Sequence, residues 1–475
     1  MIRVELSGLV ALGIALLAGA CGGDAPGPGP APIEPVVEEL PGIVVEAEPQ
    51  RLGDAQAGYT ALVNNGYVSC GLPYSVYQTF FQAAPEHLRL PGRTGNNETL
   101  PYYYTAFETP TGVDVVAPNC LLCHAAVFEG QLVIGLGAHD ANFTVDQSVQ
   151  AQAVGGLIND PDEKAEWQKW ADRVVALSPY TQAPNRGVTP SDNIAAVLIA
   201  HRDRETLAWS NEPLLPLPPE HVVPVDVPPW WRMKQKNAMF YSAAGRGDHA
   251  RIMMSASALC TDSVQEAEQI DSYFPDVRAY ILSLEAPPFP AGVDAALAEE
   301  GRAVFETNCA QCHGKYGPDD EYPNRLIPYD EVGTDSVLAV AAAQLADVYV
   351  DWYNESFYGE LGRLEPQEGY MAPPLNGIWA TAPYFHNGSV PSLVAVLDSS
   401  LRPTYWKRDF AAGYDFNILG WPHQALDYGH DVATATERID IYDTTLLAYG
   451  NGGHTFGDPL SAAARTALFE YLKTL

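Results

Sequence analysis

Apolar side chains recur with a helical period in several stretches of the chain. Periodic segments of this kind are 163–177, 270–284, 295–305 and 462–475. Another begins at Ser191, which can cap a helix that runs towards Leu207. The pattern predicts helices in these segments, and the many turn residues of 51–119 predict a loop-rich stretch.

Residues 1–20 have the pattern of a signal peptide. Arg3 provides the positive charge, and the apolar stretch after it ends in small residues and is shorter than a membrane-spanning helix. Residues 17–21, Leu-Ala-Gly-Ala-Cys, resemble a bacterial lipoprotein signal in which Cys21 carries the lipid; plain secretion is the alternative. Residues 21–50, rich in Gly, Pro, Ala and Glu, are predicted to form a lipidated, disordered tether.

Two short motifs combine cysteine with histidine. Residues 120–124 read Cys-Leu-Leu-Cys-His, and residues 309–313 read Cys-Ala-Gln-Cys-His. This spacing is the attachment signal for c-type haem, because the two thiols bond to the porphyrin and the adjacent histidine is then held under the iron. The sequence therefore predicts two covalent haem c groups, attached by Cys120, Cys123 and His124 and by Cys309, Cys312 and His313.

The two haem motifs are followed by similar segments. Residues 277–284 and 468–475 both place a tyrosine and a final leucine at the same spacing, and a proline-rich linker at 286–290 separates the halves. The sequence predicts a mainly α fold of two tandem c-type cytochrome domains, with long loops and little β structure. The predicted domains are 51–285 and 286–475.

Charge and cysteine content narrow the choice of partner and compartment. The 475-residue chain has 26 basic and 59 acidic side chains and a formal net charge of −33, which argues against nucleic acid and against adsorption to anionic lipid. Of its seven cysteines, Cys70 and Cys260 remain after the lipid and haem sites are assigned. Export favours a disulfide between them, and two buried free thiols are the alternative.

The most basic stretch of the chain is also aromatic. Trp230 and Trp231 begin it, Lys236 lies within it, and residues 245–249 read Gly-Arg-Gly-Asp-His. We expect these residues to form a cationic pocket wall that neutralises haem propionates; a solvated loop is the alternative.

One further stretch resembles the signature loop of the bacterial di-haem cytochrome c peroxidase superfamily. Residues 375–390 read Leu-Asn-Gly-Ile-Trp-Ala-Thr-Ala-Pro-Tyr-Phe-His-Asn-Gly-Ser-Val. Together with 230–251 and 453–457, they make the chain look closest to the rubber-oxygenase-like di-haem c-type cytochromes, over most of 110–475. The resemblance implies that the N-terminal haem meets peroxide or dioxygen, whereas the C-terminal haem is fully ligated and transfers electrons.

The resemblance also implies a distal ligand for the C-terminal haem. His454 lies in a glycine-flanked loop and matches the ligand of the rubber-oxygenase-like branch. Met371, which precedes two prolines, and His386 of the signature loop are the alternatives, together with an open site. The expected iron ligands are therefore His124, His313 and His454.

The N-terminal haem is expected to have an open distal side. Di-haem peroxidases carry a distal Gly-His-Gly element soon after the first motif, where this chain has Gly-Leu-Gly at 135–137. Leu136 cannot bind iron, and His139 is either a displaced ligand or a surface residue.

Candidate catalytic residues come from the basic and aromatic stretch. Trp230 and Trp231 are candidate electron carriers between the haems, although packing at a haem edge explains them equally well. The candidates for a distal acid, base or cation are Lys236, Arg246, Asp248 and His249, for which propionate pairing or surface solvation is the alternative.

These features together predict an exported peroxidase- or dioxygenase-like oxidoreductase. Its expected partners are H₂O₂ or O₂ and an electron donor or apolar organic substrate, with no nucleic acid. The expected location is the periplasm or cell surface, with lipid anchoring to the bacterial outer membrane as the only membrane contact. A di-haem electron-transfer lipoprotein without catalysis is the alternative. The resemblance adds calcium as a candidate cofactor, although no run of ligand residues marks a site.

Overall fold

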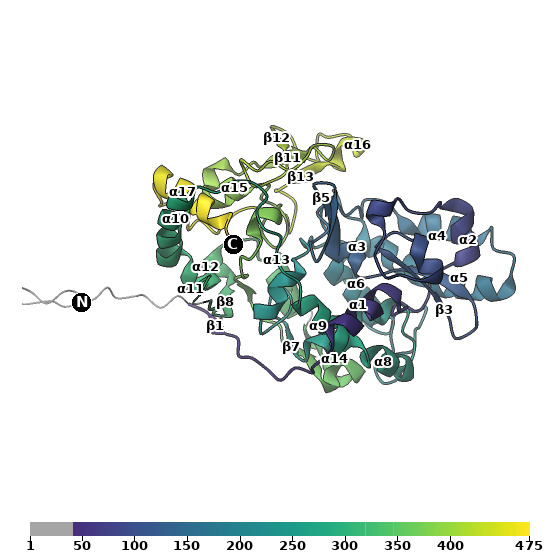
Figure 1. Ribbon diagram of the computed structural model, residues 1–475. Helices are drawn as coiled ribbons and strands as arrows, with labels where there is room; N and C mark the ends of the chain where they lie inside the picture. The colour runs from purple at the N-terminus through teal and green to yellow at the C-terminus, as the bar shows by residue number, and fades with distance from the viewer. Residues whose placement is uncertain (1–40, 319, 345) are drawn as a thin grey trace, which may run out of the picture. The chain divides into compact units, whose positions relative to one another are not determined.

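Short helices and strands alternate along the chain in the computed structural model, which describes residues 41–318, 320–344 and 346–475 (Figure 1). The α-helices are α1 (Ala55–Asn64), α2 (Tyr74–Phe80), α3 (Leu121–His124), α4 (Gln147–Gly155), α5 (Pro161–Thr181), α6 (Ser191–Ala200), α7 (His249–Met254), α8 (Val264–Asp271), α9 (Phe274–Leu282), α10 (Ala295–Asn308), α11 (Ala310–His313), α12 (Tyr329–Val332), α13 (Val337–Gln344), α14 (Asp351–Glu355), α15 (Leu393–Leu397), α16 (Ala435–Arg438) and α17 (Ala462–Leu472).

The strands are shorter than most of these helices. They are β1 (Ile43–Val44), β2 (Leu72–Pro73), β3 (Tyr104–Glu108), β4 (Asp114–Pro118), β5 (Ala125–Phe128), β6 (Gln131–Ile134), β7 (Gly245–Gly247), β8 (Arg325–Pro328), β9 (Gly362–Leu364), β10 (Gly369–Met371), β11 (Tyr405–Arg408), β12 (His423–Leu426) and β13 (Ile441–Asp443). Among the 3₁₀ turns, η3 (Trp230–Gln235) matters most for the sites described below.

The periodic segments are helical, although their ends differ from the prediction. Segments 163–177, 295–305 and 462–475 lie within α5, α10 and α17 or overlap them. Segment 270–284 is divided between α8 and α9, because Pro275 lacks a backbone N–H and fits only the first turn of a helix. Helix α6 ends at Ala200 and does not continue towards Leu207.

Two helix pairs pack closely through glycine. Helix α1 packs against α9, and α10 packs against α17. A Cβ atom on Gly58 of α1 would lie 1.8 Å from the carbonyl oxygen of Asp276, and one on Gly301 of α10 would lie 1.9 Å from that of Ala467. Only glycine permits these approaches, so each haem motif follows a helix that is held against a later helix in the same way.

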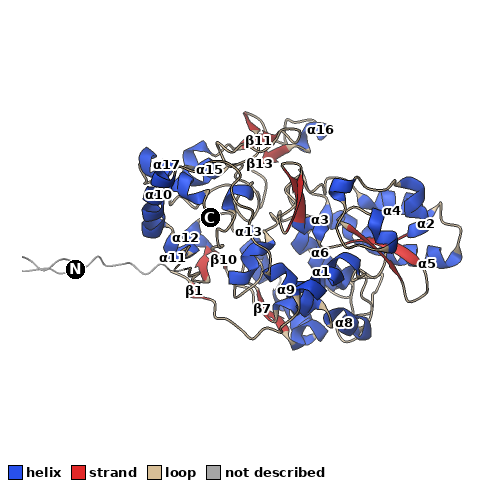
Figure 2. Cartoon of the chain, viewed as in Figure 1, coloured by secondary structure: helices blue, strands red, loops and turns tan. Residues whose placement is uncertain are grey.

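The predicted fold class is wrong, because the structure contains too much β structure for a mainly α pair of tandem cytochrome domains. Helices account for 39% of the structure and strands for 14%. The strands form several small sheets, shown in red in Figure 2. Two of these sheets, β1-β8-β10 and β7-β9, join strands from distant parts of the chain. Such short strands leave no alternating pattern in the sequence, so the prediction missed them.

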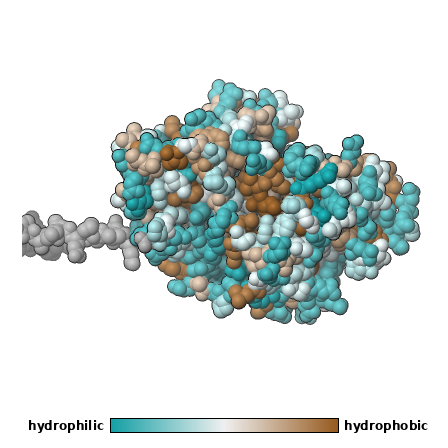
Figure 3. Space-filling model, in the orientation of Figure 1, coloured by the Kyte–Doolittle hydropathy of each residue, from teal (hydrophilic) through white to brown (hydrophobic). Residues whose placement is uncertain are grey.

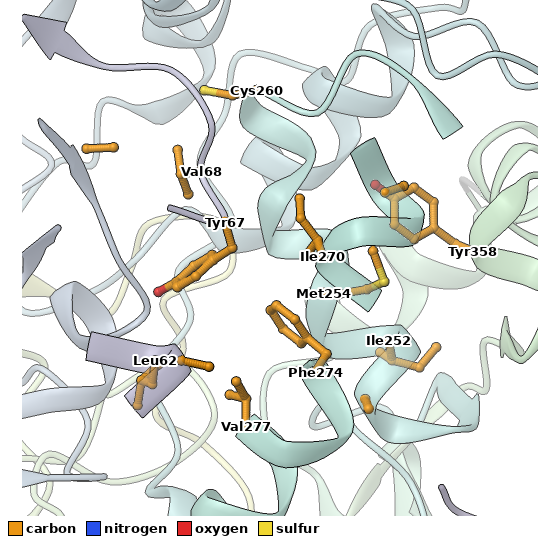
Figure 4. Close-up of a cluster of buried hydrophobic side chains, with 14 of the residues drawn as sticks. Leu62, Tyr67, Val68, Ile252, Met254, Cys260, Ile270, Phe274, Val277 and Tyr358 are labelled. Atoms are coloured by element: carbon orange, nitrogen blue, oxygen red, sulfur yellow. The ribbon is translucent and has the colours of Figure 1, made fainter. Parts of the chain in front are cut away.

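A buried core in the N-terminal half surrounds the first haem motif. It contains Leu62, Tyr67, Leu121, Trp230 and Phe274, and it extends to the other side chains drawn in Figure 4. Cys70 and Cys260 form a disulfide within this core, which is the pairing that export favours. A second core contains Trp231, Phe305 and Trp379 and lies beside the second motif.

Residues 43–51, which we call the N-terminal strap, connect the two halves of the chain. Strand β1 pairs with β8, where Ile43 lies opposite Leu326. Further along the strap, the Nε2 atom of Gln50 donates a hydrogen bond to the carbonyl of Gly247 at 2.7 Å. The strap is the purple segment that leaves β1 in Figure 1. Residues 41–50 of the predicted tether thus belong to the folded part of the chain.

The signal peptide at 1–20, Cys21 and tether residues 22–40 lie outside the described residues. Residues 41–475 form one compact unit, so the predicted domain boundary at 285/286 stays a prediction. Within the described residues, no helix is long and apolar enough to cross a membrane. The face shown in Figure 3 is mostly polar, with one apolar area near its middle.

Ion pairs at Arg51 attach the end of the strap to the N-terminal half. The Arg51 guanidinium contacts both carboxylate oxygens of Asp271 at 2.7 Å and an oxygen of Asp248 at 2.9 Å. Asp271 also pairs with the buried Arg251 at 3.0 Å. Since Asp248 and Asp271 are largely buried, the positive charge of Arg51 compensates carboxylates that water solvates poorly.

We predict that Arg51→Met lowers the free energy of unfolding by about 2 kcal/mol, because two poorly solvated carboxylates lose a partner. Arg363→Met is the matched control, since Arg363 of β9 also pairs with a residue of the strap, Glu48, but its side chain is 43% exposed. That control is expected to cost less than about 1 kcal/mol. Urea denaturation of the holoproteins measures both values, and equal losses would contradict the prediction.

Candidate haem-binding sites

The first haem motif forms a short helix next to the N-terminal core. Cys120 immediately precedes α3, which contains Cys123 and ends at His124. The Cys120 backbone N–H donates to the hydroxyl of the buried Tyr67. Neither Cys120 nor Cys123 takes part in a disulfide, so both thiols are free for thioether bonds.

The His124 ring is buried and held by an aromatic neighbour. Trp230 stacks on it with centroids 4.8 Å apart and an interplanar angle of 20°. Burial lowers the pKa of His124 to about 4, while the nearby Pro228 carbonyl opposes this shift. His124 is therefore neutral at pH 7, which is the form that binds a metal.

The second haem motif begins where α10 ends. Cys309 is the C-cap of α10 and the N-cap of α11, which ends at His313. The Nδ1 atom of His313 lies 2.8 Å from the Pro373 carbonyl oxygen. A hydrogen bond there places the proton on Nδ1 and leaves the Nε2 lone pair for iron.

His454 lies in a strained loop opposite His313. The backbone φ angle of His454 is +45°, a value that residues other than glycine rarely adopt. The preceding Gly453 packs against the backbone of Gly333. Arg402 fixes this loop by donating to the carbonyls of Gly453 at 2.6 Å and His454 at 3.1 Å. Residues with a strained backbone cluster at ligand-binding sites, so the backbone conformation of His454 agrees with its predicted role as a ligand.

The separation of the His313 and His454 rings fits a pair of axial ligands. Their centroids are 6.1 Å apart. An iron atom bonded to one nitrogen of each ring at about 2 Å would place the centroids about 6 Å apart. Burial lowers the pKa of His454 to about 3 and also lowers the pKa of His313, so both imidazoles are neutral at pH 7. His454 remains a predicted ligand that the geometry accommodates.

The two alternative ligands have other surroundings. Met371 is 2% exposed and packs in a small core that includes Val45 of the strap and Leu326. The ring of His386 stacks on Tyr370 with centroids 4.3 Å apart. Neither side chain shows a ring contact with His313, in contrast to His454.

Consecutive residues of η3 connect the surroundings of the two motifs. Trp230 stacks on His124, as described above. The Nε1–H of Trp231 donates to the Asn376 carbonyl at 2.8 Å, and Nε–H of Arg232 donates to the same oxygen at 3.0 Å. Burial lowers the pKa of His313, and the nearby positive charge of Arg232 lowers it further. The hydrogen bond to the Pro373 carbonyl acts in the other direction and raises this pKa. Three consecutive residues, 230–232, therefore contact the surroundings of both motifs.

The loop at 135–137 packs on the first motif and contains no ligand. The Gly135 N–H donates to the His124 carbonyl at 2.8 Å, and Leu136 is buried in the second core. His139 is also buried, not at the surface, with Trp421 4.3 Å from its ring. Its Nδ1 accepts from Arg408 at 2.9 Å, so the neutral ring carries its proton on Nε2 and has no free lone pair for iron.

Most of the candidates for a distal acid, base or cation have structural partners. Arg246 donates from Nε to the Ala243 carbonyl at 2.8 Å. Asp248 pairs with Arg51 and caps α7. Burial lowers the pKa of Lys236 to about 8, and Arg232 adds to this shift. Two neighbouring cations such as Lys236 and Arg232 suit an acidic group such as a haem propionate, and the cationic pocket wall stays a prediction.

His249 is the candidate without a structural partner. It is 2% exposed, and neither ring nitrogen makes a hydrogen bond to the described residues. Burial lowers its pKa to about 4, Arg278 adds to this shift and the Asn237 backbone opposes it. The next residue, Ala250, lies in the same core as Trp230. An unpaired buried imidazole is costly, so a group outside the chain is expected to contact it.

Several residues that shape these sites were not predicted. The carbonyls of Pro228 and Pro373 lie next to His124 and His313, and Arg402 holds the His454 loop. The prolines had a signal in the sequence, since each begins a Pro-Pro pair after its haem motif. Arg402 had none, because its role depends on a contact across the fold. The described residues contain no group of three or more His, Cys, Asp or Glu side chains that could hold a metal ion, so none marks a calcium site.

Part of the second half matches a known family. Residues 369–407 match the family model described as RoxA-like, cytochrome c-like. The chain is 27% identical over 313 residues to the uncharacterized protein y4iM of Sinorhizobium fredii (strain NBRC 101917 / NGR234), covering 58% of this chain and 69% of that one. It is 28% identical over 290 residues to the uncharacterized protein y4iJ of the same strain, covering 46% of each. The chain thus spans less than half the length of y4iJ.

The family match supports a RoxA-like cytochrome c branch and implies haem c as the cofactor of an oxidoreductase. It includes the signature loop but neither haem motif, and it ends before His454. The wider di-haem peroxidase superfamily, the number of haems and the axial ligands remain predictions.

We predict that His454→Ala converts one low-spin haem to high spin, because it removes an axial nitrogen. Met371→Ala is the matched control and is expected to leave the visible and EPR spectra unchanged, since Met371 packs in a separate small core. Spectra of the purified ferric holoproteins measure both effects. A sulfur-to-iron charge-transfer band that disappears in Met371→Ala would reject His454 as the ligand.

Proposed function

We propose that the protein is an exported di-haem c-type cytochrome oxidoreductase of the peroxidase or oxygenase type. The haem attached at 120–124 reacts with H₂O₂ or O₂, and the haem attached at 309–313 and held by His313 and His454 relays electrons. The observation that carries this proposal is the passage of Trp230, Trp231 and Arg232 from the His124 ring to the surroundings of His313.

The two sites differ in what the chain offers on the far side of each haem. His313 has His454 at a separation that suits two axial ligands. For His124 the residues after the motif provide Leu136, which cannot bind iron, and His139, whose Nδ1 is engaged by Arg408. Unequal ligation of this kind supports one reactive haem and one electron-transfer haem.

The bound haems supply the redox chemistry, and the residues of the chain orient and insulate it. The stacked Trp230 orients His124 and the Pro373 carbonyl orients His313, while Trp230 and Trp231 exclude water between the sites. His249 is neutral at pH 7 and offers both a donor and an acceptor nitrogen. We assign it the role of moving a proton to or from bound oxidant at the first site.

Export, anchoring and partners complete the proposal. A lipid on Cys21 would hold the protein at the outer membrane, facing the periplasm or the cell surface. The acidic surface implied by the net charge of −33 suits a basic electron donor. An apolar organic molecule is the alternative reductant.

We predict that cyanide binds rapidly to one haem per chain and that the second haem does not respond, because only the first has an open side. Titration of the ferric holoprotein, followed in the Soret band and by EPR, gives the stoichiometry. Two slowly reacting, six-coordinate haems would overturn the proposal and favour a di-haem electron-transfer lipoprotein. Peroxide turnover with a reduced cytochrome, compared with oxygen uptake on an alkene, then separates peroxidase from dioxygenase.

We further predict that His249→Phe slows the reaction of the first haem with peroxide about 100-fold, which is the usual loss when a proton-transfer group is removed. His221→Phe is the control, since His221 is exposed and contacts the Leu447 carbonyl. Stopped-flow absorbance measures the rate. An unchanged rate in His249→Phe with normal haem content would remove His249 from the reaction.

A further inference from the structure

Five tyrosine rings form a continuous series beside the first haem motif. Tyr102, Tyr103 and Tyr104 are consecutive, with neighbouring ring centroids 4.9 and 4.8 Å apart. Tyr104 contacts Tyr77 at 6.0 Å, and Tyr77 contacts Tyr74 at 6.3 Å. We call these five residues the tyrosine ladder.

One end of the ladder is fixed to the haem motif. Asn119 directly precedes Cys120. Its side-chain amide donates to the Tyr102 carbonyl at 2.9 Å, and its backbone N–H donates to the Tyr103 carbonyl at 3.0 Å. Tyr102 and Cys120 both pack against the N-terminal core. The inner rings are therefore held at a constant position relative to the cysteine that would carry the porphyrin.

The other end of the ladder reaches the surface. Tyr77 is 6% exposed, whereas Tyr74 is only half-buried, as are the three consecutive tyrosines of the ladder. Phe81 stacks on Tyr77 at 4.8 Å and is 51% exposed. The series thus leads from the haem attachment site to solvent through rings in contact, which is a geometry that permits short electron steps.

The chemistry of the ladder suits transfer of one electron at a time. Burial raises the pKa of Tyr77 and Tyr102 to about 12, and the charge of Asp140 adds to the shift of Tyr102. These two phenols are therefore protonated at pH 7, and oxidation of either releases a proton. Asp140 is exposed and can pass that proton to water.

We propose that the tyrosine ladder is an exit route for oxidising equivalents that the first haem site obtains from hydrogen peroxide. The proposal rests on the proposed function, which supplies this oxidant. H₂O₂ takes up two electrons and two protons to give two water molecules. When no donor is bound, a tyrosine of the ladder gives one electron and releases its phenolic proton. The next tyrosine outward then reduces it, and a small one-electron reductant in solvent, such as ascorbate, returns an electron and a proton to the outermost ring. The second electron follows the same path.

The test uses the ferric holoprotein, hydrogen peroxide and a nitroso spin trap, with mass spectrometry to locate trapped radicals. Wild-type protein is expected to form adducts on Tyr74 and Tyr103. Tyr77→Phe should reduce the Tyr74 adduct at least tenfold and leave the Tyr103 adduct, because it interrupts the ladder between them. Tyr405→Phe, in β11, is the control and should leave both adducts unchanged.

The Soret band distinguishes failure of the ladder from failure of the proposed function. A Soret response to peroxide without adducts on the ladder, or with a Tyr74 adduct undiminished in Tyr77→Phe, overturns the ladder alone. A Soret band that peroxide leaves unchanged overturns the proposed function and the ladder with it.

Discussion

The passage of Trp230, Trp231 and Arg232 between the two haem motifs is the constraint on which the rest of the structure depends. These residues are consecutive, so the first motif and the signature loop at 375–390 cannot move apart without breaking the hydrogen bonds to Asn376. Both tryptophans are largely buried, one in each of the two cores. Burial of two such large rings favours the joined arrangement strongly, so the cores form around a shared element.

Local contacts also position the predicted iron ligands. Each proximal histidine lies next to a proline carbonyl, and each carbonyl begins a Pro-Pro pair. Proline has no backbone N–H and a fixed φ, so the pair holds the carbonyl in place without competing for it. Burial keeps the imidazoles of His124, His313 and His454 neutral. Restricted backbone conformations at the prolines and at the strained His454 thus hold the predicted ligands in fixed positions before haem is bound.

Contacts between distant segments complete the sites. The N-terminal strap runs from its pairing with β8 to Arg51, which pairs with Asp248, the residue before His249. Arg402 holds the His454 loop from another part of the chain. The tyrosine ladder likewise joins Tyr77 of α2 to β3 across the start of the fold. All of these contacts lie outside the haem motifs, yet they determine which side chains lie around each motif.

The sequence by itself predicts the covalent chemistry and determined most of the long helices. The haem motifs are local patterns, and helical periodicity is local as well, so residues 120–124, 309–313 and most of α5, α10 and α17 could be predicted. Tertiary structure decided the small sheets, the burial of His139 against Arg408 and the facing of His454 towards His313. Each of these depends on residues far apart in the chain that meet only after folding, and a pairing of two to five residues leaves no periodic signal.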